Sequence, residues 1–226
     1  MPSILLGAQS GVDVSPNTYP SVRGAVMVYH GLWQVASDAN YLNPYNFFTQ
    51  QLRNWGWHVV SVENAYTGST SYLTTSFNGD GTGAAYLSSI LAEWEDDVAA
   101  VQSVVGSLPV VVAGWSWGGL HALHSAASST TKADAWAVHL PAADPNYLTE
   151  FSSYDLSALS DFNETDLAAQ QGFCSYATDD TRVGYAAAQQ LIIDTGCDSV
   201  EYTSLGHSTT FVTIQDMLDW FWGLSF

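Results

Sequence analysis

A serine flanked by glycines and tryptophans lies near the middle of the chain, in the stretch VVVAGWSWGGLH at residues 110–121. The apolar run before it suits a strand buried on both faces, and the residues after it suit a helix. A sharp turn between the two would lift the Ser116 hydroxyl above a sheet, where Gly114 and Gly118 avoid side-chain collisions. A hydroxyl presented in this way is typical of a nucleophile, which needs a base to take its proton and an acid to orient that base.

The elements that would position this serine alternate along the chain. Short apolar runs rich in β-branched residues predict strands, and runs with apolar residues at helical spacing predict helices. The expected strands cover residues 24–31, 57–66, 108–115, 134–142, 172–180 and 198–207, and the expected helices cover 45–57, 84–106, 118–129, 183–196 and 213–224. This alternation predicts a parallel sheet with helices on both faces, in which functional residues follow the carboxyl ends of strands.

A single domain is expected over residues 1–226, because the length and the 47% hydrophobic content suit one core. The polar segment 143–170 breaks the alternation and has room for a small cap excursion over the sheet. The first 23 residues are too short and irregular for a full set of early antiparallel strands, which predicts a trimmed sheet.

The pattern Gly114-Trp115-Ser116-Trp117-Gly118 resembles the nucleophile elbow, G-x-S-x-G, of the α/β-hydrolase superfamily, and the element order resembles that fold over nearly the whole chain. The resemblance implies a three-layer α/β sandwich with a mostly parallel central sheet and a small or absent cap. It points to a small serine esterase of dienelactone-hydrolase or carboxylesterase type. The run GWSWGG also resembles the GWSMGG elbow of bacterial cutinase-like polyester hydrolases, although their acid and histidine loops have no match here.

The same resemblance implies an acid and a histidine, in the chain order serine, acid, histidine. Only His207 lies at the carboxyl end of the last expected strand, so it is the expected base. The run YATDDTRV resembles the acid loop of the family, small-x-x-Asp-x-x-Val, which selects Asp180. Asp179, one residue earlier, and Asp144, after the preceding strand, remain alternatives. The other five histidines are expected to pack or to orient loops: His30, His58, His121, His124 and His139.

Two backbone N–H groups are needed to bind the oxyanion that forms when the serine attacks a carbonyl. The residue after the nucleophile, Trp117, supplies one of them. The run YHGLW at residues 29–33 resembles the His-Gly-x oxyanion loop of the family, which makes Leu32 the expected second donor and Trp33 its alternative.

Several aromatic residues lie in loops at the carboxyl edge of the expected sheet, near Ser116. They predict a substrate pocket with apolar walls. The candidate substrate-binding residues are Trp33, Tyr66, Trp115 and Tyr147. The ring of Trp117, directly after the nucleophile, is the fifth aromatic side chain expected at this edge. Such walls favour neutral acyl or aromatic esters over anionic ones, since an unpaired charge is costly to desolvate. Arg182 is the one cation expected near the serine, and its guanidinium could bind a carboxylate on the substrate if it turned inward.

The net charge of the chain excludes some classes of binding partner. Four Lys and Arg residues stand against 22 Asp and Glu, a net charge of -18, which repels nucleic acids and anionic membrane surfaces. A small-molecule ester is therefore the expected partner, and the oligomeric state is not predicted. No run approaches the roughly 20 apolar residues of a membrane span, and the start of the chain lacks the pattern of a secretory signal. We expect a soluble protein, with the cytoplasm favoured.

The two cysteines, Cys174 and Cys197, lack the paired spacing of a zinc site. Two separate thiols are favoured, while a disulfide between the neighbouring predicted strands stays open. No metal or organic cofactor is expected, because a serine triad needs neither.

The function expected from these residues is hydrolysis of carboxylic esters through an acyl-enzyme. Acyl transfer or thioester hydrolysis on the same triad is an alternative. A binding protein that kept the fold and lost the chemistry is another, although all three triad positions are filled.

Overall fold

The computed structural model describes residues 12–14, 21–32, 34, 43–62, 83–148, 151 and 154–226. In this part of the chain, seven strands form one sheet in the order β1-β3-β2-β4-β5-β6-β7. The strands are β1 (Val12–Val14), β2 (Gly24–Tyr29), β3 (Trp57–Val62), β4 (Val110–Trp115), β5 (Ala135–His139), β6 (Gln171–Ala177) and β7 (Asp198–Tyr202). Strands β2 to β7 are parallel, and β1 pairs antiparallel with β3. The mostly parallel sheet expected from the sequence is confirmed.

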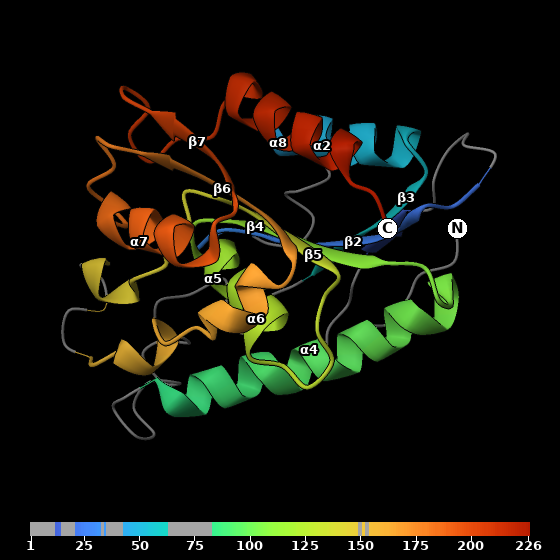
Figure 1. Cartoon of the computed structure of the whole chain (residues 1–226), viewed down its shortest axis with the longest axis horizontal. Coiled ribbons are helices and arrows are strands. Elements are labelled where there is room, and N and C mark those ends of the chain that lie inside the picture. Colours follow the sequence, from blue (N-terminus) through green and yellow to red (C-terminus); the bar gives the residue numbers. More distant parts are fainter. Residues whose placement is uncertain are drawn as a thin grey trace.

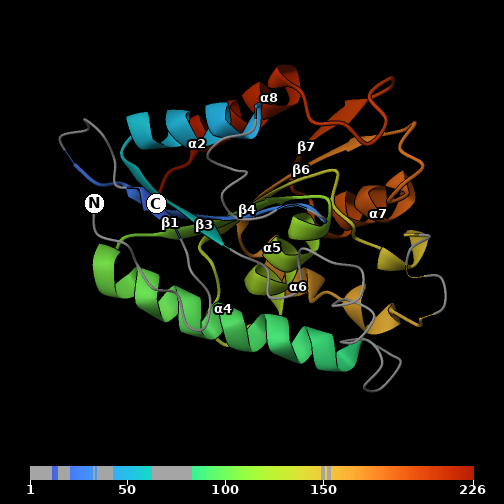
Figure 2. The ribbon, with the colours of Figure 1, turned by 180° about the vertical axis from the view of Figure 1, so that it is seen from behind.

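Helices cover both faces of this sheet (Figures 1 and 2). One face carries α2 (Tyr45–Asn54) and α8 (Phe211–Gly223). The other face carries α4 (Ala84–Val105), α5 (Trp117–Ala127), α6 (Glu164–Ala168) and α7 (Tyr185–Thr195). The three-layer α/β sandwich is therefore confirmed.

The pleat of the strands divides the core into two layers. In β2, Val26 and Val28 pack toward α2 and α8, whereas Ala25 and Met27 pack toward α4 and α5. Successive side chains of a strand point to opposite faces, so a strand covered by helices on both sides is apolar throughout. Every residue of β2 and β4 is buried, as their apolar runs predict.

Several elements end earlier than the sequence predicted. The strand expected over 134–142 stops at His139, because Leu140 has a φ of +47° and leaves the extended conformation. The last strand ends at Tyr202 rather than at residue 207. The 22-residue helix α4 ends before Gly106, whose left-handed φ of +67° stops it.

The described residues of the segment 143–170 pack with the helices on one face of the sheet, and the small cap excursion expected there stays a prediction. These residues form the short helices η1 (Pro145–Tyr147), η3 (Ser157–Leu159) and α6. Leu148, Leu156, Leu159 and Phe162 are buried in the core cluster shared with α4 and α5. The segment therefore extends the helical layer, because its apolar side chains are buried there.

The two cysteines are free thiols, so no disulfide joins them. Cys174 is fully buried in β6, and burial raises its pKa well above the usual value. None of the described helices combines the length and the apolar character that crossing a membrane would require.

Candidate active site

The turn between β4 and α5 presents Ser116. Its φ of +54° lies in the left-handed region, an uncommon and strained conformation for a residue with a side chain. Glycines make this turn possible: a Cβ on Gly118 would lie 2.2 Å from the carbonyl oxygen of Tyr29, and one on Gly114 would lie 2.2 Å from that of Gly118. The backbones approach too closely there for any larger residue.

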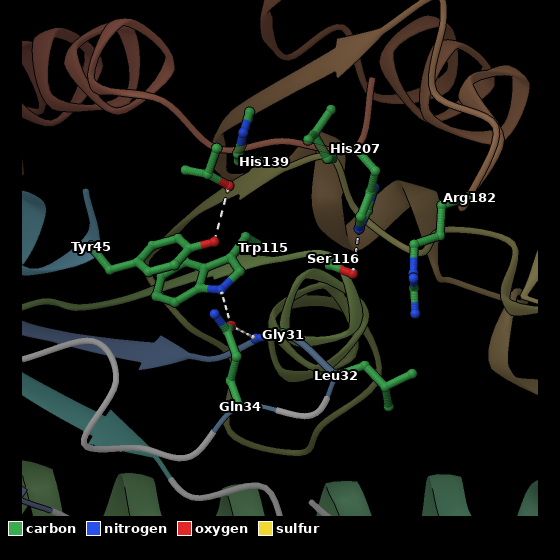
Figure 3. A pocket seen from close by; sticks show the side chains of 11 residues that line it. Gly31, Leu32, Gln34, Tyr45, Trp115, Ser116, His139, Arg182 and His207 are labelled. Carbon is green, nitrogen blue, oxygen red and sulfur yellow. Dashed lines mark hydrogen bonds between the residues drawn. The ribbon is translucent and has the colours of Figure 1, made fainter. Parts of the chain in front are cut away.

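Three side chains from three loops form a hydrogen-bonded series. The Nε2 atom of His207 lies 2.9 Å from the Oγ of Ser116, and its Nδ1 atom lies 2.7 Å from the Oδ2 of Asp180. Ser116 follows β4, Asp180 follows β6 and His207 follows β7, so each residue comes after the carboxyl end of a parallel strand. Figure 3 shows the His207 ring directed at the serine hydroxyl.

Asp180 is held in its charged form, although it is only 4% exposed. Burial acts to raise its pKa, but the hydrogen bond and the electrostatic attraction of His207 outweigh that effect. The backbone N–H groups of Arg182 and Val183 also donate to Oδ1, at 2.8 and 3.3 Å. Together these interactions lower the pKa of Asp180 below its usual value.

The two alternative acids bond to backbone groups instead. The Oδ1 of Asp179 accepts from the N–H groups of Leu205 and Gly206, at 3.0 and 2.8 Å. Asp144 caps η1 by accepting from the N–H of Asn146 at 3.0 Å. Asp180 is thus the aspartate that bonds to His207, whereas Asp179 and Asp144 stabilise loops through their bonds to backbone N–H groups.

A pocket of about 330 Å³ opens onto Ser116 (Figure 3). Its described lining comes from loops after five strands and from the start of α2. The lining residues are Gly31, Leu32, Gln34, Tyr45, Trp115, Ser116, His139, Leu140, Arg182, His207 and Thr209. No described residue of the segment 143–170 takes part in it.

No protein-family model matches the chain, and no curated protein matches it either. Solved structures do. The protein TT1662 from Thermus thermophilus superposes with a TM-score of 0.74 at 12% identity, over 97% of this chain and 95% of that one. A dienelactone hydrolase from Anabaena variabilis gives 0.65 at 16% identity, over 97% and 94%. Esterase 2 of Thermogutta terrifontis gives 0.60 at 12% identity, over 93% and 86%.

The chain has the α/β-hydrolase fold. This conclusion rests on the sheet order, on the elbow after β4 and on similarity over nearly the full length of two of these structures. Identities of 12% and 16% are too low to transfer an activity, so the likeness concerns the fold alone.

In this α/β hydrolase fold, one expected oxyanion donor adjoins the nucleophile in the chain and the other lines the same pocket. Trp117 is the first residue of α5, directly after Ser116, and Leu32 lines the pocket on the loop after β2. The N–H of Gly31 donates to the Oε1 of Gln34 at 2.8 Å. The catalytic role of the Leu32 and Trp117 amides stays a prediction.

The aromatic wall differs from the expected one. Trp115 lines the pocket, and its ring stacks on Tyr45 with centroids 4.0 Å apart and planes 11° from parallel. Tyr45 was not predicted to line the pocket, although its place at the start of the helix that follows β2 was a usable signal. Trp33 and Tyr66 lie outside the described residues.

Tyr147 and the ring of Trp117 do not line this pocket, which corrects two expectations. Tyr147 is 49% exposed on η1, and its ring lies against Gly184. The indole of Trp117 is fully buried and donates to the hydroxyl of Tyr86 at 2.9 Å. The backbone of a helix sets the direction of its side chains. Trp117 is the first residue of α5, and its indole points toward α4 and not into the pocket.

Most of the other histidines are buried and hydrogen-bonded, as expected of packing residues. His121 bonds to Tyr86, His124 to the carbonyl of Leu159, and His139 to Ser175 at 2.7 Å. Burial lowers their pKa values to about 3, about 4 and about 3, so all three are neutral at working pH. His139 also lines the pocket, a place that its position inside a predicted strand did not reveal.

Arg182 lines the pocket on the side of Ser116 opposite to Tyr45 and Trp115 (Figure 3). The chain has only four Lys and Arg residues, and the other three, Arg23, Arg53 and Lys132, do not line this pocket. The described lining holds no Asp or Glu. With Arg182, Gln34 and Thr209 in its lining, the pocket is more polar than the pocket with apolar walls expected from the sequence.

Proposed function

We propose that the protein is a serine hydrolase that cleaves small carboxylic esters through an acyl-enzyme. The observation that carries this proposal is the series from Ser116 to His207 to Asp180, across 2.9 and 2.7 Å. This is the arrangement that a general base and its orienting acid require. Two proteins of similar fold, a dienelactone hydrolase and an esterase by their names, are consistent with it.

In the first half of the proposed reaction, the Oγ of Ser116 attacks the scissile carbonyl while the Nε2 of His207 takes its proton. Asp180 accepts a hydrogen bond from the Nδ1–H of His207 and stabilises the imidazolium that forms. The negative charge on the former carbonyl oxygen is stabilised by the N–H groups of Leu32 and Trp117. Collapse of this intermediate expels the alcohol, which receives the proton from His207.

In the second half, water attacks the acyl-enzyme by the same route. His207 takes a proton from the water, and the resulting tetrahedral intermediate expels Ser116, which recovers its proton from the histidine. The products are a carboxylic acid and an alcohol, and no metal or organic cofactor takes part in these steps.

The proposed substrate is a small neutral or aromatic ester. A pocket of about 330 Å³ has room for a small acyl or alcohol group, and the stacked rings of Tyr45 and Trp115 offer it an aromatic wall. Arg182 would donate hydrogen bonds to an uncharged oxygen of such a substrate. An anionic ester would meet the field of a chain with net charge -18.

The direct test is hydrolysis of 4-nitrophenyl butyrate by the wild-type protein and by Ser116→Ala. We expect the variant to lose about 1,000-fold or more in kcat while remaining folded, because it loses the nucleophile and little packing. Circular dichroism and thermal unfolding control for folding. A fluorophosphonate reagent should label Ser116 in the wild-type protein, as shown by peptide mass spectrometry.

The outcomes separate the possible functions. Labelling of a different serine, or full activity in Ser116→Ala, contradicts the assignment of the nucleophile. Labelled Ser116 without ester turnover would direct the search to thioesters or acyl acceptors. A protein that neither reacts with the reagent nor turns over esters is a binding protein on this fold.

A further inference from the structure

One side-chain oxygen joins two parts of the site. The Oε1 of Gln34 accepts the backbone N–H of Gly31 at 2.8 Å and the indole Nε1–H of Trp115 at 2.7 Å (Figure 3). Gly31 belongs to the loop after β2 that carries Leu32, and Trp115 directly precedes Ser116. Gln34 therefore connects the expected oxyanion loop to the nucleophile elbow.

The surroundings of this link restrict its movement. Trp115 is 3% exposed, and its ring is covered by the stacked ring of Tyr45. The Tyr45 hydroxyl in turn donates to the Oγ1 of Thr209 at 3.1 Å, two residues after His207. The wall formed by Gln34, Trp115, Tyr45 and Thr209 thus connects the loops that follow β2, β4 and β7.

Gly31 leaves room for the side-chain amide of Gln34. A Cβ on Gly31 would lie 2.9 Å from the Oε1 of Gln34 and 3.3 Å from the Cδ1 of Trp115. A larger residue would therefore displace the Gln34 amide from its present position. Because the Gly31 N–H is already bonded to Gln34, it does not serve the substrate, and the next amide along the chain belongs to Leu32.

We propose that Gln34 is a positioning residue that fixes the oxyanion loop relative to the nucleophile, an inference that rests on the proposed ester hydrolysis. The described bonds of Gln34 go to Gly31 and Trp115, and not to the triad, so it acts through these two partners. Donors aimed at an oxyanion stabilise the transition state more than the bound ester. Loosening the loop should therefore lower kcat and leave KM nearly unchanged.

The test compares Gln34→Leu, Trp115→Phe and the double variant on the same short ester. Leucine removes the acceptor at similar size, and phenylalanine removes the indole donor while keeping an aromatic ring. We expect Gln34→Leu to lower kcat by about 10-fold to 100-fold with KM within about 2-fold. The double variant should lose no more than Gln34→Leu alone, because both substitutions break one link.

Hydrogen exchange gives a measurement that does not depend on turnover. In Gln34→Leu, the Gly31 amide and the Trp115 indole N–H should exchange with solvent faster than in the wild-type protein, as followed by NMR. Gln170→Leu is the matched control: its half-buried glutamine donates to the carbonyl of Ala126 at 2.7 Å, away from the pocket. That variant should keep wild-type kcat and wild-type exchange at Gly31 and Trp115.

The two proposals fail in different ways. A wild-type protein that turns over no ester overturns the proposed function, and the role of Gln34 falls with it. An active wild-type protein with unchanged kcat in Gln34→Leu overturns the role of Gln34 alone. A rise in KM at constant kcat, or additive losses in the double variant, would also overturn it, since either would show that Gln34 binds substrate or acts independently of Trp115.

Discussion

The loop between β6 and α7 places two adjacent aspartates with different partners. Asp180 bonds to the His207 ring, whereas Asp179 bonds to the backbone N–H groups of Leu205 and Gly206 just before it. The two neighbouring residues of this turn direct their side chains differently, so one carboxylate orients the histidine and the other holds the loop that carries the histidine.

Asparagine substitutions separate these two roles. Asp180→Asn should lower kcat on a short ester by about 1,000-fold to 10,000-fold, because an amide neither holds the imidazole in the right tautomer nor stabilises its charged form. Asp179→Asn should be far milder, since an amide oxygen can still accept both backbone N–H groups. The measurement is kcat for both variants under identical conditions. A reversed order of the two effects would identify Asp179 as the acid.

Among the elements, α4 carries an unusual buried carboxyl. Asp97 is 2% exposed and lies in the layer between α4 and the sheet. Burial, together with the neighbouring charge of Asp96, raises its pKa to about 7. The folded state therefore holds the proton of Asp97 more tightly than the unfolded state does, and stability falls as pH rises from about 4 to above 7.

This difference predicts a stabilising substitution. Asp97→Asn removes the ionisation, so it should raise the free energy of unfolding relative to wild type at pH 9 more than at pH 5. The difference between the two gains should be on the order of 2 kcal/mol. Urea unfolding at both pH values measures it. An equal effect at the two pH values would mean that Asp97 does not titrate differently in the folded and unfolded chains.

The charges of the protein act on an anionic substrate in two opposing ways. The net charge of -18 repels an anionic ester over long range, whereas Arg182 lies directly at the pocket. Salt screens the first effect more strongly than a close contact, because the Debye length is about 10 Å at 0.1 M salt. The two effects can therefore be separated by ionic strength.

A matched pair of esters, one neutral and one bearing a carboxylate, tests this balance. We expect the neutral ester to have the higher kcat/KM at low salt, and the disadvantage of the anionic ester to shrink as salt is added. Arg182→Ala should reduce kcat/KM for both esters, because each loses a hydrogen-bond donor. If the anionic ester is preferred and Arg182→Ala abolishes that preference, the pocket selects anions and the neutral-ester proposal is wrong.

The sheet, the elbow and the order of the loops could be predicted from the amino-acid sequence alone. The apolar run before Ser116 and its flanking glycines are local signals, since a strand, a sharp turn and a helix form from neighbouring residues. Parallel strands also place all their carboxyl ends at one edge, so His207 after the last strand was expected near Ser116. Residues that directly follow strands were therefore predictable.

The set of side chains that line the pocket could not be predicted without the three-dimensional fold. Gln34, Tyr45, Thr209 and His139 come from four separate segments and line the pocket around Ser116, yet none of them belongs to a catalytic sequence motif. Tyr147, which looked equivalent in the sequence, is directed toward Gly184 instead. Contacts between distant segments depend on strand register and on side-chain direction at each helix start, and a single sequence encodes these only through the packing of the whole chain.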